Sequence, residues 1–174
     1  MALPAQAGGG WALSAVCTLM KLRLIAVGAR APSWVASGYA EYSKRLPREL
    51  KLELVEVAAP KHHDPQRSRE QEGVRTLKHV AATDWVVALD ERGSELDSMA
   101  LADRVTAWRD QGRNVAVVVG GADGLADAVR ERANEFLSLS RLTLPHYVVR
   151  VVFAEALYRA WSIGAGHPYH RGEP

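Results

Sequence analysis

The feature that most constrains the fold is residues 115–119, a run of five consecutive apolar residues followed at once by two glycines. A strand that is apolar on both faces is typical of a parallel sheet covered by helices on both sides. Residues 85–89 form a second run of this kind. Between the two runs, Leu101, Val105 and Trp108 recur at helical spacing. The order strand, helix, strand therefore places this region in the α/β class.

The rest of the chain from Met20 onwards alternates in the same way. Short apolar runs predict further strands at 22–27, 50–57 and 136–142, and helical spacing predicts further helices after Pro32, over 66–80, over 125–134 and after Pro145. The 174 residues fit one domain large enough to bury a core. We therefore expect one α/β domain in which helices sandwich a mostly parallel sheet.

Residues 1–19 lack the pattern of the domain and carry no charged side chain. Their apolar part, 11–19, is too short to span a bilayer, and the basic start of a signal peptide is missing. We expect a disordered leader or an extension from an upstream start codon, followed by the domain over 20–174. The single cysteine, Cys17, allows no internal disulfide and fits a reducing cytoplasm.

The last predicted helix is apolar almost all the way round, from Val148 to Trp161. A helix of that kind is buried on more than one side. Because the sheet can cover only one side, a second subunit is the simplest cover for the other, and we expect a homodimer. The net charge of +2 permits a nucleic-acid partner without demanding one.

Ligands of open parallel sheets bind beyond the carboxyl ends of the strands. Asp90, which follows one strand, could hold a ribose hydroxyl or lie in a solvated turn. After the next strand, Gly120, Gly121 and Gly124 either let a ligand approach the backbone closely or form a plain tight turn. The glycine spacing matches neither a dinucleotide-binding fingerprint nor a P-loop.

Chemistry-bearing residues also gather near the carboxyl terminus. His146 and Arg150 would share a face at the start of the last helix, where anions are favoured; a histidine that only caps the helix is the alternative. Glu155 and Arg159 are spaced for a structural ion pair. The remaining histidines have no carboxylate or cysteine set beside them, so we predict no metal site.

Four segments taken together resemble one family closely. They are 89–90 (Leu-Asp), 119–125 (Val-Gly-Gly-Ala-Asp-Gly-Leu), 137–146 (Leu-Ser-Leu-Ser-Arg-Leu-Thr-Leu-Pro-His) and 155–163 (Glu-Ala-Leu-Tyr-Arg-Ala-Trp-Ser-Ile). In order and spacing they are similar to the ribosomal RNA large subunit methyltransferase H family, the pseudouridine N3-methyltransferases of the SPOUT class. The resemblance covers 20–174 and leaves only the leader outside it.

The resemblance implies a carboxyl-terminal trefoil knot in the α/β domain, a homodimer, and S-adenosylmethionine as the methyl donor, with no metal. The implied substrate is N3 of a pseudouridine in the 23S ribosomal RNA of the assembled ribosome, which places the protein in the cytoplasm and away from membranes. A protein that docks on a composite ribosomal surface has no need of a broad basic face, which fits the near-neutral charge. The residues implied to line the donor pocket are Leu89, Gly121, Ser140, Arg141, Leu142, Thr143, Leu144 and Pro145.

Methyl transfer to this base requires its nitrogen in line with the methyl group and removal of an imide proton that is mostly retained at neutral pH. The catalytic candidates near that proton are His146, Tyr169 and His170. The candidates for contact with phosphate, or for stabilising negative charge, are Arg150, Arg159 and Arg171. By composition alone, the segment 167–174 could equally be a frayed terminus.

Two other classes of function stay open from the sequence. A non-catalytic ribosome-associated RNA-binding factor could keep the same knotted fold without turnover, although the intact glycine, Thr-Leu-Pro-His and tail motifs argue against it. A nicotinamide oxidoreductase is disfavoured because the dinucleotide-binding fingerprint is missing.

Overall fold

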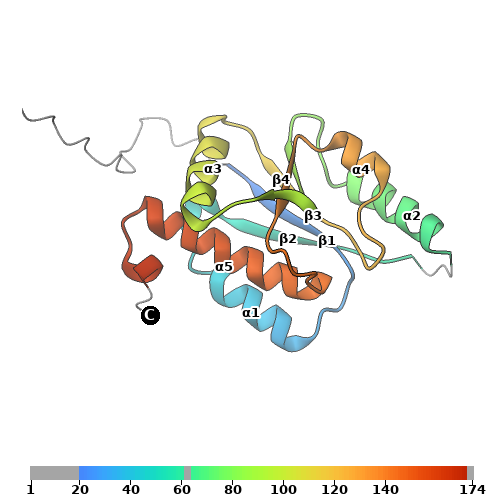
Figure 1. Cartoon of the computed structure of the whole chain (residues 1–174), viewed down its shortest axis with the longest axis horizontal. Coiled ribbons are helices and arrows are strands. Elements are labelled where there is room, and N and C mark those ends of the chain that lie inside the picture. Colours follow the sequence, from blue (N-terminus) through green and yellow to red (C-terminus); the bar gives the residue numbers. More distant parts are fainter. Residues whose placement is uncertain (1–19, 61–63, 172–174) are drawn as a thin grey trace, which may run out of the picture.

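The computed structural model describes residues 20–60 and 64–171, apart from the side chain of His170. The expectations for the leader at 1–19 and for the histidines at 62–63 concern residues outside this description. The described chain forms a central sheet with helices on both faces (Figure 1). Its strands are β1 (Leu22–Val27), β2 (Leu52–Val57), β3 (Trp85–Glu95), β4 (Val115–Val119) and β5 (Glu135–Ser138). Neighbouring strands pair in parallel, in the order β2-β1-β4-β3-β5.

Helices connect the strands and form the two outer layers. The α-helices are α1 (Ser33–Ser43), α2 (Pro65–Leu77), α3 (Ser98–Asp110), α4 (Asp127–Arg132) and α5 (His146–Gly164), and the 3-10 helices are η1 (Arg48–Leu50) and η2 (Pro168–Arg171). Tyr39, Trp108 and Phe153 bring α1, α3 and α5 into the core on one face of the sheet. Leu77 and Val129 bring α2 and α4 into the core on the other face. The predicted α/β sandwich is confirmed.

Strand β4 lies in the middle of the sheet, between β1 and β3. Each of its residues is at most 4% exposed. Its apolar run is therefore covered on both faces, as the sequence predicts. This central position also places the glycines that follow β4 between the carboxyl ends of its two neighbours.

Two of the helices, α2 and α3, begin at a side-chain cap that the sequence provides. The carboxylate of Asp64 accepts hydrogen bonds from the backbone amides of Gln66, over 3.0 Å, and Arg67, and Pro65 takes the first helical position of α2. Asp97 caps α3 in the same way, through the amide of Ala100 over 2.8 Å. These local signals fix the entry of the chain into each helix.

Strand β3 is longer than its apolar run predicts. It continues past Leu89 to Glu95, because Ser94 and Glu95 pair with β5 after a register shift. Gly93 permits this close approach, since a Cβ at Gly93 would lie 2.5 Å from the carbonyl carbon of Leu137. The polar stretch that the sequence indicates as a turn is therefore part of the sheet.

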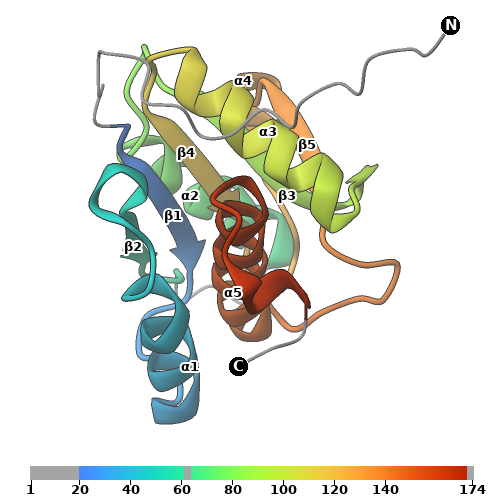
Figure 2. The ribbon, with the colours of Figure 1, turned by 90° about the vertical axis from the view of Figure 1, so that its left-hand side faces the viewer.

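Strand β5 is shorter than predicted and is followed by a loop. It ends at Ser138, whereas the expected strand reached 142. The hydroxyl of Ser138 donates to the carbonyl oxygen of Ser140 over 3.0 Å, and the amide of Leu142 donates to the Ser140 hydroxyl over 2.9 Å. These bonds turn the segment 139–145 away from the sheet before α5 begins (Figure 2). The trefoil knot that the family resemblance implies stays a prediction.

Helix α5 lies between α1 and α3, and every one of its residues is at least half-buried. Helix α1 comes so close that a Cβ at Gly38 would lie 3.1 Å from Cγ1 of Val151. Helices α1 and α3 of the same chain thus cover α5 in addition to the sheet, whereas within one chain the sequence pattern predicted cover from the sheet alone. The homodimer stays a prediction. Among the described residues, none of the helices has the length and apolar character needed to cross a membrane.

Candidate active site

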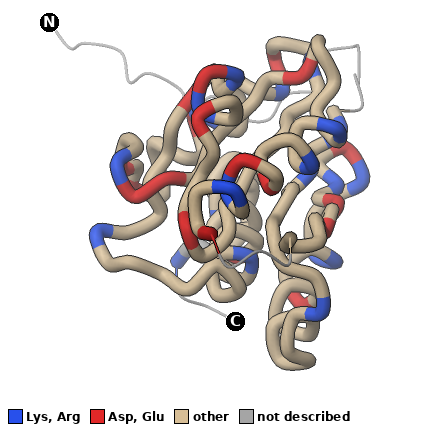
Figure 3. Tube along the Cα trace, turned by 90° about the vertical axis from the view of Figure 1, so that its right-hand side faces the viewer, with Lys and Arg blue, Asp and Glu red and all other residues tan. Residues whose placement is uncertain are grey.

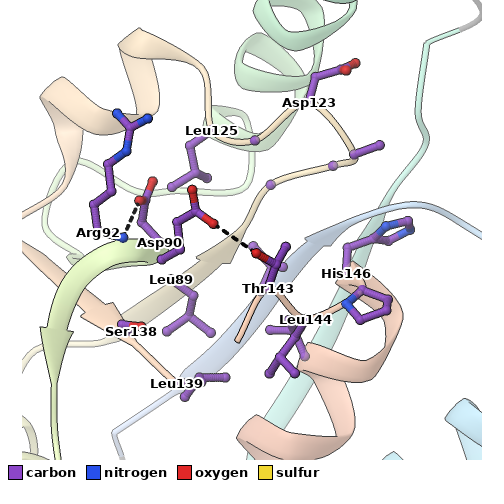
Figure 4. Close-up of a pocket in the computed structure, with 18 of the residues that line it drawn as sticks. Leu89, Asp90, Arg92, Asp123, Leu125, Ser138, Leu139, Thr143, Leu144 and His146 are labelled. Carbon is purple, nitrogen blue, oxygen red and sulfur yellow. Dashed lines mark hydrogen bonds between the residues drawn. The ribbon is translucent and has the colours of Figure 1, made fainter. Parts of the chain in front are cut away.

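A cavity of about 950 Å³ opens at the carboxyl ends of β3 and β4. Three stretches of chain form most of it: residues 89–92 in the middle of β3, the turn after β4, and the loop that joins β5 to α5. Arg69 of α2 and Asp127 and Arg130 of α4 also line it. The side chains of Leu89, Leu125 and Leu144 lie at its wall (Figure 4). Of the residues implied to hold the donor, those that line the cavity are Leu89, Gly121, Ser140, Leu142, Thr143, Leu144 and Pro145.

Asp90 lies in the wall of the cavity but is engaged by the protein. Its carboxylate forms an ion pair with Arg130 over 2.6 Å, and its Oδ1 accepts a hydrogen bond from the amide of Arg92 over 2.9 Å. The side chain of Asp90 is only 7% exposed. The solvated turn that the sequence left open is therefore wrong. The carboxylate joins the end of β3 to α4, and this contact braces the floor of the cavity.

The glycine turn after β4 is closed on itself. The amide of Gly124 donates to the carbonyl oxygen of Gly121 over 3.1 Å, and Gly124 has a φ of 82°. A Cβ at Gly120 would lie 2.6 Å from the carbonyl oxygen of Gly124, so a side chain has no room there. Because the glycine turn is this tight, its backbone lies at the cavity edge, and no side chain separates the backbone of the turn from the cavity.

The space beside Gly121 is filled by the protein. A Cβ at Gly121 would lie 2.6 Å from Oε2 of Glu72, a residue of α2 that is 8% exposed. Burial first, and the nearby charge of Asp123 second, raise the pKa of Glu72 above its ordinary range. A side chain at 121 would therefore displace the Glu72 carboxylate from its place in the protein interior.

The third wall is the loop 139–145. The hydroxyl of Thr143 lies 3.4 Å from Oε2 of Glu91, which links the loop to the end of β3 across the cavity (Figure 4). Arg141 points elsewhere: its side chain is 88% exposed, with Nε 3.6 Å from Oε1 of Glu95. The structure therefore brings together all the implied donor residues except the side chain of Arg141.

His146 begins α5 and lines the cavity beside Pro145. Its Nε2 faces the end of β1, where a Cβ at Gly28 would lie 3.2 Å from it. Burial first, and the cation of Arg150 second, lower the pKa of His146. The imidazole is therefore neutral at neutral pH and able to accept a proton, which a histidine that only capped the helix would not need.

Arg150 lies inside the protein rather than beside the cavity opening. Its side chain is fully buried, and NH1 donates to Oε1 of Glu56 over 2.7 Å. NH2 donates to the carbonyl oxygens of Val27, over 3.1 Å, and Gly28. A guanidinium held in this way cannot reach an RNA phosphate, so the expected phosphate contact does not fit this placement. Arg150 instead ties the start of α5 to the ends of β1 and β2.

The tail residues lie at the other end of α5. Arg159 pairs with Glu155 through Nε over 3.0 Å, as the spacing predicts, and the hydroxyl of Tyr169 donates to the same carboxylate over 3.1 Å. Arg171 is exposed, and the side chain of His170 is outside the described part of the chain. His146 is the first residue of α5, whereas Tyr169 is bound to Glu155 in the middle of the helix, so one chain does not place these two candidates side by side (Figure 1).

Sequence reasoning missed two residues at this edge of the sheet. Glu72 belongs to a helix that is polar in sequence, so no local signal marks one of its acids as buried. Arg30, which follows β1, is exposed and has a φ of 63°, a left-handed conformation that costs a residue other than glycine about 1 kcal/mol or more. Such strain gathers at functional sites, and no sequence pattern announces it.

Comparisons with known proteins agree with this geometry. A family model described as "Predicted SPOUT methyltransferase" matches residues 20–170. The ribosomal RNA large subunit methyltransferase H of Hahella chejuensis is 50% identical over 155 residues, which are 87% of this chain and 99% of that protein. The protein of the same name from Burkholderia mallei is 50% identical over 157 residues, with the same coverage.

A solved structure supports the fold. The crystal structure of a probable methyltransferase from Bordetella pertussis Tohama I matches with a TM-score of 0.52 and 20% identity, over 82% of this chain and 97% of that chain. At this level of identity the likeness bears on the fold alone. The family match, by contrast, runs through all three walls of the cavity and through the helix that His146 begins. The chain belongs to the SPOUT methyltransferase family.

Proposed function

We propose that this protein transfers a methyl group from S-adenosylmethionine to N3 of a pseudouridine in the 23S ribosomal RNA of the assembled ribosome. The observation that carries the proposal is that the cavity is built by the segments that carry the family resemblance, at 89–90, 119–125 and 137–146. The names of the relatives with 50% identity support ribosomal RNA of the large subunit as the substrate.

The cavity suits the proposed donor in size and chemistry. Its volume of about 950 Å³ is within the range of small-molecule sites. Leucine side chains offer apolar contact, and backbone groups of the glycine turn and of 140–145 offer hydrogen bonds. Glu91, Asp123 and Asp127 also line the cavity, and their carboxylates complement a ligand that carries a sulfonium and an ammonium group. For Arg141, the backbone rather than the side chain is the proposed contact.

His146 is the proposed general base. S-adenosylmethionine, when bound, supplies a methyl group that is already electrophilic. His146 must therefore remove the imide proton of the base. The N3–H bond breaks, an N–H bond forms on the imidazole, and the electron pair of N3 becomes free to attack the methyl group. The neutral state that burial and Arg150 impose on His146 is the state that this step requires.

Tyr169 and His170 are proposed to act from the partner subunit of a homodimer. Burial, a hydrogen bond to Tyr42 and the charge of Glu155 raise the pKa of Tyr169, so its phenol stays protonated and acts as a hydrogen-bond donor rather than a base. Arg171 is exposed and can contact phosphate, and Arg159 holds Glu155 beside Tyr169. Arg30, which is exposed just after β1, is proposed in place of Arg150 for the phosphate contact.

The charge distribution is consistent with docking on a composite surface. Basic and acidic positions are interspersed over the side shown in Figure 3. Such a surface favours recognition through shape and a few placed contacts over broad attraction to RNA. A protein that modifies assembled ribosomes works where ribosomes are, which places it in the cytoplasm.

The test is mass spectrometry of ribosomal RNA after incubation of assembled ribosomes with the protein and isotope-labelled donor. The expected product is one labelled pseudouridine in the large-subunit RNA, and none when the large subunit is offered alone. The His146→Ala variant should give no label. Ribosome binding without labelling would overturn the proposal in favour of a non-catalytic ribosome-associated factor.

A further inference from the structure

We infer that Glu72 is a positioning residue for the donor site, which fastens the glycine turn from the side of the sheet away from α5. This inference rests on the proposed function for the identity of the donor. Glu72 belongs to α2 and is buried; it does not line the cavity, although Arg69, one turn earlier on the same helix, does. The residue therefore acts through Gly121 rather than by contact with the ligand.

The carboxylate of Glu72 lies directly against Gly121. A Cβ at Gly121 would be 2.6 Å from Oε2, 2.9 Å from Oε1 and 3.0 Å from Cδ, so the end of the side chain fills the space that a Cβ would take. The backbone amide of Gly121 lies close enough to this carboxylate to favour its charged form, against the larger effect of burial on the pKa of Glu72. A charge-assisted interaction with a buried acceptor fixes the direction of that peptide more firmly than a bond to water would.

Helix α2 is itself held close to the turn. A Cβ at Gly73 would lie 2.5 Å from the Cβ of Ala126, the residue that precedes α4. Glu72 and Gly73 are adjacent, so α2 holds the segment 120–126 at both of its ends.

The second oxygen of Glu72 is the unusual feature. Within the described residues, Oε2 is buried and has no hydrogen-bond partner. A buried acceptor without a partner costs stability, and a glutamine or an apolar residue would avoid part of that cost. The carboxylate is explained if the turn needs a strong acceptor at this point, so that its peptides are already oriented when the donor arrives.

The experiment measures donor affinity by calorimetry for five variants: Glu72→Ala, Glu72→Gln, Gly121→Ala, the double variant Glu72→Ala with Gly121→Ala, and Glu70→Ala as the exposed control on the same helix. Glu72→Ala should weaken donor binding about tenfold, the effect of losing a charge-assisted hydrogen bond. Glu72→Gln keeps an acceptor oxygen and should stay within about threefold of the wild type. Steady-state kinetics of Glu72→Ala should show a raised KM for the donor, with kcat and the KM for ribosomes unchanged.

The double variant makes the sharpest test. Gly121→Ala should weaken donor binding more than Glu72→Ala does, because its Cβ meets the carboxylate, and removing that carboxylate should bring the double variant back to the affinity of Glu72→Ala. If the double variant binds the donor no better than Gly121→Ala, the donor and not Glu72 needs the space, and the inference is overturned. Unchanged donor affinity in Glu72→Ala would overturn it as well.

Amide hydrogen exchange without any ligand provides a readout that does not depend on the donor. The Gly121 amide should exchange slowly in the wild type and in Glu70→Ala, and at least about tenfold faster in Glu72→Ala. If the wild type binds no S-adenosylmethionine, the proposed function fails, while this exchange rate still decides whether Glu72 holds the turn. Equal exchange of Gly121 in wild type and Glu72→Ala would overturn the inference.

Discussion

The guanidinium of Arg150 donates to Oε1 of Glu56 over 2.7 Å, although the two residues are 94 positions apart in the sequence. The bond joins the first turns of α5 to the end of β2, at the far side of β1. His146 stands one turn earlier on α5, so this ion pair also fixes the place of the proposed base. Its partners give Arg150 a structural role that can be measured.

Replacing Arg150 by methionine should lower the free energy of unfolding by roughly 3 kcal/mol, the lower end of the range for breaking a buried pair, because Glu56 stays in contact with water. The matched control is Arg45→Met, whose exposed pair with Glu41 on α1 is screened by water and should change the stability far less. Urea denaturation measures both values. If Arg150→Met is as stable as the wild type but binds ribosomes more weakly, the structural role is wrong and the phosphate contact expected from the sequence is supported.

The pH dependence of methyl transfer should report His146. Burial and the Arg150 cation lower its pKa, so the imidazole is neutral at neutral pH and gains a proton only as the pH falls through that lowered value. The rate should therefore decline on the acid side at a lower pH than an unperturbed histidine would give. In single-turnover assays His146→Asn should lose both the rate and the acid limb, whereas the exposed control His79→Asn should keep them. An unchanged acid limb in His146→Asn would assign the base elsewhere.

Subunit complementation should show that the tail acts across a dimer. The tail reaches back along α5 only as far as Glu155, nine residues after His146, which is about 13 Å along the helix. Deleting 167–174 should abolish methyl transfer and leave donor binding and the dimer intact. Mixing that variant with Gly121→Val, in which the donor pocket is blocked, should restore up to one working site per heterodimer. An inactive heterodimer would mean that each tail serves its own chain, and full activity of the deletion variant would make the tail idle.

Deleting residues 1–19 should leave the melting temperature and the methyl-transfer rate essentially unchanged. The family match begins at residue 20, and Met20 is already part of the core, with 4% of its surface exposed. Calorimetry and the ribosome assay test this directly. A large loss in either quantity would mean that the leader packs against the domain.

Local patterns predicted the parts of the fold that depend on local physics. The run 115–119 needs no partner to indicate a buried parallel strand, and Pro145 marks the start of α5 because the residue before a helix tolerates its fixed φ. Asp64 and Asp97 cap helices through amides two or three residues away. In each case the residues that decide the structure are neighbours in the sequence.

The sequence could not predict features that depend on distant partners. Residues 90–95 are polar and resemble a turn, yet β5 draws the last of them into the sheet through a shifted register. His146 and Arg150 do share the start of α5, but only the folded chain shows that the Arg150 guanidinium forms an ion pair with Glu56. Glu72 is one acid among several on a polar helix, and its importance arises from Gly121, which meets it only after β3 and β4 are in place.

Strand β1 lies inside the sheet, between β2 and β4, and this position has a consequence for folding during synthesis. Strand β4, one of the two neighbours of β1, is synthesised much later. Lys21 and Asn114, which lie at the paired starts of β1 and β4, are 93 positions apart in the sequence. At synthesis rates of about 5–20 residues per second, that gap takes roughly 5–20 seconds. During this interval the apolar strand Leu22–Val27 has β2 on one side and an open edge on the other. A nascent chain of this design must therefore be kept from aggregating until its later half emerges, and its sheet closes only near the end of translation.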